Sequence, residues 1–144
     1  MMRDMVENYY LEKDYNCAET TLHIINDTYH LGLSDEDFKL VGAYGGGFGC
    51  GITCGALAGA MAALGKLTIC QRAHATDGFR DLCGAYVEAF KEKLHNTNCD
   101  AIKEEFFLDE ERRCLRTVQL AADLFEEFAA RHGIQPLPEE EAKK

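Results

Sequence analysis

Apolar residues recur every three to four positions along most of the chain, which is the spacing of one face of an α-helix. Between Thr76 and His95 the apolar positions are Phe79, Leu82, Cys83, Tyr86, Val87, Phe90 and Leu94. Similar patterns predict helices over 2–13, 17–30, 34–44, 53–71, 76–95, 98–107 and 109–132. No stretch of the sequence alternates apolar and polar residues as a half-buried strand does. The pattern therefore predicts an all-α fold, an antiparallel bundle of about four to five core helices.

Several of these helices have recognisable start signals. Asn16-Cys17-Ala18-Glu19 has the form of a capping box, with Asn16 as the N-cap. Thr53 and Asn98 are suitable N-caps for the helices that follow them. At this length the chain is one domain, and we expect a helical domain over 1–133 followed by a frayed acidic tail over 134–144.

A dense glycine cluster, Gly45 to Gly59, interrupts the helical pattern and predicts a turn before the central helix. The uncharged stretch 41–65 is long enough to span a bilayer, but its glycines would unwind a helix in lipid, so a buried segment of a soluble domain is the better interpretation. A phosphate-binding loop is also disfavoured. No Lys-Ser or Lys-Thr follows the glycines and no strand precedes them.

The formal net charge of -10 argues against nucleic acid or an anionic membrane as a partner. The N-terminus is polar and acidic, unlike a signal peptide, so we expect a cytoplasmic protein. In a reducing compartment the seven cysteines indicate metal ligands, redox thiols or small buried side chains rather than structural disulfides.

The position of each cysteine separates these alternatives. Cys54 lies in the first turn of a predicted helix, where unpaired N–H groups would lower its thiol pKa; the alternative is a buried small side chain beside packing glycines. Cys17 and Cys99 also open predicted helices. Cys114 lies inside the last predicted helix among arginines, or simply on its core face. Cys70 and Cys83 fit core packing better, and none of the pairs has the CxxC spacing of common metal or redox motifs.

Together these residues resemble a known family. Asn16-Cys17-Ala18-Glu19, the glycine run 45–49, Cys54-Gly55-Ala56-Leu57-Ala58-Gly59, and then Cys99 and Cys114 look like the redox-active protein family named for its pattern C…GCAxxG…C…C. The resemblance covers nearly the whole chain. It implies that Cys17, Cys54, Cys99 and Cys114 are the four family cysteines, and it leaves Cys50, Cys70 and Cys83 outside the pattern. Family members often lie near transporter genes, and related domains resemble the part of split-Soret cytochromes that carries an iron-sulfur centre.

The resemblance leads to two hypotheses. In the first, the four family cysteines form a redox or electron-transfer site, as ligands of an iron-sulfur cluster or as two dithiol/disulfide pairs of a thiol-dependent oxidoreductase, which needs no cofactor. Gly47, Gly49, Gly55 and Gly59 would then make room around the thiolates, with Cys54 the central thiol and Cys17 its nearest partner. The partner would be an electron donor or acceptor.

In the second hypothesis the chain is a non-catalytic module. The same cysteines, Cys17, Cys54, Cys99 and Cys114, would hold zinc in a closed tetrahedral site. Alternatively, the thiols would stay reduced while a ridge of glycine and alanine residues forms a homodimer interface.

Overall fold

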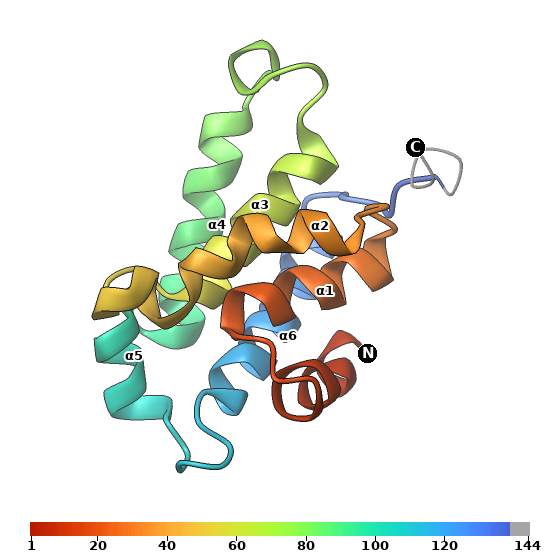
Figure 1. Ribbon diagram of the computed structural model, residues 1–144. Helices are drawn as coiled ribbons and strands as arrows, with labels where there is room; N and C mark the ends of the chain where they lie inside the picture. The colour runs from red at the N-terminus through yellow and green to blue at the C-terminus, as the bar shows by residue number, and fades with distance from the viewer. Residues whose placement is uncertain (139–144) are drawn as a thin grey trace.

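The structure, a computed structural model, describes residues 1–138 and is built from helices (Figure 1). The longer helices are α1 (Cys17–Tyr29), α3 (Gly55–Thr68), α4 (Phe79–Leu94), α5 (Cys99–Phe106) and α6 (Leu115–Arg131). The short helical segments are η1 (Met2–Met5), η2 (Asn8–Glu12), α2 (Asp35–Phe38), η3 (Lys39–Tyr44), η4 (Gly47–Gly51) and η5 (Ala73–Ala75).

Within residues 1–138 there is no strand, and the β-type pairing is an isolated antiparallel bridge between Thr53 and Asn98. The all-α prediction is therefore confirmed. In Figure 1 the axes of α1 and α4 run in different directions, so the finer expectation of an antiparallel bundle of four to five helices is not confirmed. None of the helices in this part of the chain is both long and apolar enough to cross a membrane.

The core lies where α1 packs on α3 and α4 packs on α6. Gly59 brings α3 close to α1, because a Cβ at Gly59 would stand 2.6 Å from the carbonyl oxygen of Ala18. Tyr86 of α4 meets Phe128 of α6 edge to face, with ring centroids 4.9 Å apart. Five small residues of α3 are buried, namely Gly55, Ala56, Gly59, Ala60 and Ala63, whereas Ala62 is exposed. These five residues pack inside the chain, and the homodimer stays a prediction.

Two of the predicted helix starts are confirmed in atomic detail. Asn16 accepts a hydrogen bond from the Glu19 N–H at 2.9 Å, and the Glu19 carboxylate accepts one from the Asn16 N–H at 3.0 Å, which completes the capping box of α1. At α5, the side chain of Asn98 accepts a hydrogen bond from the Ala101 N–H at 2.9 Å. Cys17 and Cys99 therefore each occupy the first position of a helix.

Two other starts differ from the prediction. Thr53 does not cap α3, because its backbone pairs with Asn98, and α3 begins at Gly55 with Cys54 as its N-cap. The last helix begins at Leu115 rather than Asp109. The Asp109 side chain instead caps a separate turn by accepting the Arg112 N–H at 2.7 Å, and Cys114 becomes the N-cap of α6.

Two residues after Gly133 contact the rest of the fold. Ile134 and Leu137 pack against the core, and the Leu137 N–H donates a hydrogen bond to the carbonyl of Tyr29 at 2.9 Å. The frayed tail over 134–144 stays a prediction, and 139–144 lie outside the described residues.

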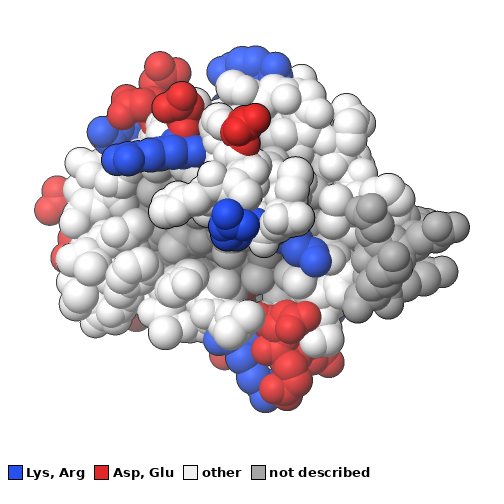
Figure 2. Space-filling view, turned by 90° about the horizontal axis from the view of Figure 1, so that it is seen from above, with Lys and Arg blue, Asp and Glu red and all other residues white. Residues whose placement is uncertain are grey.

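The net charge of -10 is not spread evenly over the surface. Figure 2 views the molecule from the side of the loop between α3 and α4, and it shows small groups of acidic and basic residues, some of them side by side, around a broad uncharged area. This face therefore carries no continuous acidic surface.

Candidate functional site: a cavity lined by four cysteines

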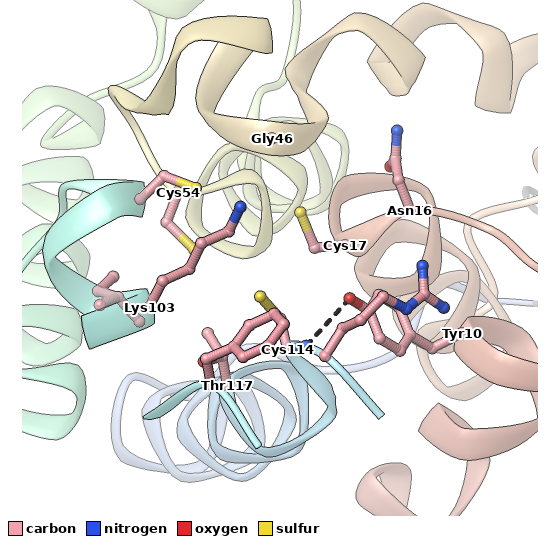
Figure 3. Close-up of a pocket in the computed structure, with 12 residues that line it drawn as sticks. Tyr10, Asn16, Cys17, Gly46, Cys54, Lys103, Cys114 and Thr117 are labelled. Carbon is pink, nitrogen blue, oxygen red and sulfur yellow. Dashed lines mark hydrogen bonds between the residues drawn. The ribbon is translucent and has the colours of Figure 1, made fainter. Parts of the chain in front are cut away.

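The four family cysteines line one cavity of about 220 Å³ (Figure 3). Each comes from a different helix start: Cys17 from α1, Cys54 from α3, Cys99 from α5 and Cys114 from α6. The other lining residues are Tyr10, Asn16, Gly46, Ile102, Lys103, Phe107, Arg113 and Thr117. The fold thus brings four cysteines, which are spread from position 17 to position 114 of the sequence, together at the N-terminal ends of four helices. Their function as one site stays a prediction.

The Thr53–Asn98 bridge brings the second and third of these cysteines together. The Cys54 N–H donates a hydrogen bond to the Thr97 carbonyl at 2.8 Å, and the Cys99 N–H donates one to the Ile52 carbonyl. These bonds tie the chain before α3 to the chain before α5. The two cysteines therefore enter the cavity from adjacent strand-like segments, although neither segment belongs to a sheet.

Glycines make room for two of the sulfurs. A Cβ at Gly55 would collide with the sulfur of Cys17, and a Cβ at Gly47 would stand 2.6 Å from Cys99 Cβ and 3.3 Å from its sulfur. The two other predicted glycines have different surroundings. Gly59 packs on the Ala18 backbone, and Gly49, with φ of +75°, has no atom within 4 Å of its Cβ position. Of these four, Gly47 and Gly55 are thus the ones that face cysteines.

The charged residues that line the cavity differ in sign from the net charge of the protein. Among the cavity's lining residues the charged side chains are Lys103 and Arg113, and both are cations. Figure 3 shows the Lys103 side chain extending toward the cysteine sulfurs. Arg113 lies over the ring of Tyr10, with its guanidinium carbon 4.8 Å from the centroid. Together with the helix N-termini, these cations favour an anionic occupant.

Burial is the largest influence on the pKa values of Cys54, Cys99 and Cys114 in the metal-free protein. Cys54 is 4% exposed, and its burial raises its pKa to about 12; hydrogen bonds from the N–H groups of Ala56 and Leu57 oppose this shift without reversing it. The prediction that the helix start lowers the pKa of Cys54 is therefore wrong. Burial is also the main cause of the raised pKa of Cys99 and Cys114, and Lys103 opposes it in both.

That Cys54 is the central thiol, with Cys17 as its nearest partner, stays a prediction. After burial, the charge of Cys17 is a further cause of the raised pKa of Cys54, Cys99 and Cys114, and the charge of Cys99 acts in the same direction on Cys54 and Cys114. Figure 3 shows Cys17, Cys54 and Cys114 around the same opening. The Tyr10 hydroxyl accepts a hydrogen bond from the Cys114 N–H at 3.2 Å.

The donor set limits what the cavity could hold. In residues 1–138 no group of three or more His, Cys, Asp or Glu side chains is arranged to hold a single metal ion. The four cysteines line a cavity and do not converge on one position that a single metal ion could occupy. A single zinc ion requires every sulfur at about 2.3 Å from the metal, whereas an iron-sulfur cluster spreads its thiolate ligands over several iron atoms. Four thiols with no lining carboxylate or imidazole are the donor set of iron-sulfur clusters and of structural zinc sites alike.

The remaining cysteines lie elsewhere. Cys50 and Cys70 are exposed, Cys83 is half-buried, and none of them lines the cavity. The expectation that Cys70 and Cys83 fill the core is wrong for Cys70. Sequence reasoning missed Tyr10, Lys103 and Thr117 as lining residues, because no motif marks them and they come from three separate segments.

Comparison with known proteins agrees with this geometry. The family model described as "Putative redox-active protein (C_GCAxxG_C_C)" matches residues 15–128. The match includes all four lining cysteines and most of the chain, so the protein belongs to this family. No curated protein and no solved structure matches the chain.

Proposed function

We propose that this protein is an electron carrier in which Cys17, Cys54, Cys99 and Cys114 hold an iron-sulfur cluster. One observation carries the proposal: four cysteines from four separate helix starts line one cavity whose charged lining residues are cations. When bound, the cluster would supply reversible one-electron transfer.

The chain's own residues suit that role. An iron-sulfur cluster with four thiolate ligands is an anion, and the helix N-termini, Lys103 and Arg113 offset its negative charge. The thiols must lose their protons on binding, and metal coordination achieves this even for buried thiols. The burial of Cys54 and Cys99 excludes water from that side of the cavity.

Dithiol chemistry is the second candidate, and the contact of Cys17 with Gly55 favours it, because residue 55 follows Cys54 directly. In this reaction the two thiols lose two electrons and two protons to an external acceptor and form one S–S bond. The raised pKa of Cys54 opposes it, since the thiolate is the nucleophile. A structural zinc site is supported less, because no single-ion arrangement is present in residues 1–138.

Elemental analysis of protein purified without oxygen tests the proposal. We expect iron and acid-labile sulfide in similar amounts, with a broad visible absorption that fades on reduction. One equivalent of zinc in a colourless protein would instead support the structural module. A metal-free protein that loses two thiols on mild oxidation would support dithiol chemistry.

A further inference from the structure

Thr117 lines the cysteine cavity and carries a buried hydroxyl. The residue is 2% exposed and lines the cavity beside Cys114 (Figure 3). Its Oγ1 atom is buried and has no hydrogen-bond partner within the described residues. The other buried side-chain atoms in this state belong to His23, Tyr86 and Asp123, and none of those residues lines the cavity. Buried hydroxyls are normally paired, so this one calls for an explanation.

The local backbone explains why the hydroxyl has no partner in the protein. A helical threonine usually donates to the carbonyl four residues earlier. Thr21 does so to Cys17 at 2.7 Å, and Thr68 does so to Leu64 at 2.7 Å. Thr117 lies in the first turn of α6, so the residue four positions earlier is Arg113, outside the helix.

Arg113 does not provide that acceptor. It has a left-handed φ of 48°, and its carbonyl accepts a hydrogen bond from the Leu108 N–H at 3.0 Å. The irregular turn that makes Cys114 the N-cap of α6 therefore also leaves the Thr117 hydroxyl free. One backbone feature thus places a thiol and an unpaired donor at the same wall of the cavity.

We propose that the Thr117 hydroxyl donates a hydrogen bond to a sulfur atom of the iron-sulfur cluster and raises its reduction potential. The inference rests on the proposed function. A donor to an anionic sulfur stabilises the more negative, reduced state of the cluster more than the oxidised state. Removal of the hydroxyl should therefore make reduction harder.

The test uses the full chain, reconstituted without oxygen from ferrous iron and sulfide, and a potentiometric titration of its visible absorption. Thr117→Val keeps the shape of the side chain and removes the hydroxyl. We expect it to hold as much iron and sulfide as the wild type, with a reduction equilibrium constant about tenfold lower, equivalent to about 59 mV for one electron. Thr117→Ser should retain the wild-type potential.

Thr21→Val is the matched control. Thr21 is equally buried and near Cys17, but its hydroxyl already has a partner in the helix. We expect this variant to keep the wild-type potential. An equal shift in Thr21→Val and Thr117→Val would overturn the inference, because it would show a general response to loss of a buried hydroxyl.

Thermal unfolding of the metal-free proteins provides an independent readout. Because no protein group pairs with the Thr117 hydroxyl, Thr117→Val should melt at or above the wild-type temperature. A lower melting temperature, or failure to fold, would show a protein partner and overturn the inference. A loaded Thr117→Val protein with unchanged potential overturns it while leaving the proposed function intact. A wild type that takes up no iron and sulfide overturns the proposed function, and the inference with it.

Discussion

The sulfur of Cys17 lies against the α-carbon of Gly55, so closely that Gly55 has no room for a side chain. The contact joins the start of α1 to the start of α3, and residue 55 directly follows the second family cysteine. The same position is confined from another side by the Tyr44 carbonyl oxygen, 3.1 Å from the place a Cβ would take. The glycine of the Cys54-Gly55-Ala56 element is therefore required by the packing of a thiol.

Gly55→Ala should displace the Cys17 side chain. The added methyl group collides with the sulfur, and relief by moving the backbone is restricted by Tyr44. We expect a loss of about 1–3 kcal/mol in the free energy of unfolding, measured by urea denaturation, together with loss of iron and sulfide from the protein.

Gly84→Ala is the control for that substitution. Gly84 lies in α4 with no atom within 4 Å of its Cβ position. Alanine there should stabilise the protein by up to about 1 kcal/mol through helix propensity. If Gly55→Ala were as stable as Gly84→Ala, the steric account of Gly55 would be wrong.

Asn16 should contribute more to stability than an ordinary helix cap. Its side chain caps α1 and also donates a hydrogen bond to the Gly42 carbonyl at 2.9 Å. Asn16→Ala should therefore cost about 1–2 kcal/mol in urea denaturation. Asn16→Asp keeps the cap but loses the donor, so an intermediate loss is expected; equal stability of all three proteins would contradict this.

Stability of the metal-free protein should fall in alkaline solution. In the folded state the Cys54 pKa is raised from 9.0 to about 12, so between those values the unfolded chain releases a proton that the folded chain retains. The contribution of Cys54 is fully present below pH 9.0 and is lost as the pH rises toward 12. Urea denaturation at pH 8 and pH 10 measures the slope. Cys54→Ala should show a shallower decline, and an unchanged slope would argue against the raised pKa.

His23 should produce a separate loss of stability in acid. The ring is buried against Phe38, with centroids 3.6 Å apart, and burial lowers its pKa. The unfolded chain then takes up a proton more readily than the folded chain, so stability is lost as the pH falls below about 6.5. His23→Phe keeps the stacking and should remove this part of the acid dependence in denaturation series from pH 7.5 to 5. If His23→Phe kept the full acid dependence of stability, that dependence would come from other titratable groups.

Local signals in the sequence were enough to predict several parts of the site. The capping box at Asn16 and the cap at Asn98 are short-range patterns, and they correctly place Cys17 and Cys99 at helix starts. The need for close approach at Gly55 is likewise visible in the sequence, although the group that approaches is not.

Other parts depend on contacts between distant segments. Thr53 has the character of an N-cap, but its backbone is engaged by Asn98, which moves the cap to Cys54. Asp109 also resembles a helix start, yet the left-handed Arg113 ends its turn before α6 begins. Burial, and with it the raised pKa of Cys54, follows from the assembled fold and outweighs the local effect of the helix N-terminus.

The most direct test of the account replaces each cysteine by serine, one at a time, and measures iron, sulfide and visible absorption after purification without oxygen. The account predicts that Cys17→Ser, Cys54→Ser, Cys99→Ser and Cys114→Ser each lose most of the cluster. Cys50→Ser, Cys70→Ser and Cys83→Ser should keep it, because those residues do not line the cavity. Equal loss in both groups, or no iron and sulfide in the wild type, would contradict the claim that the four cysteines form one cluster site.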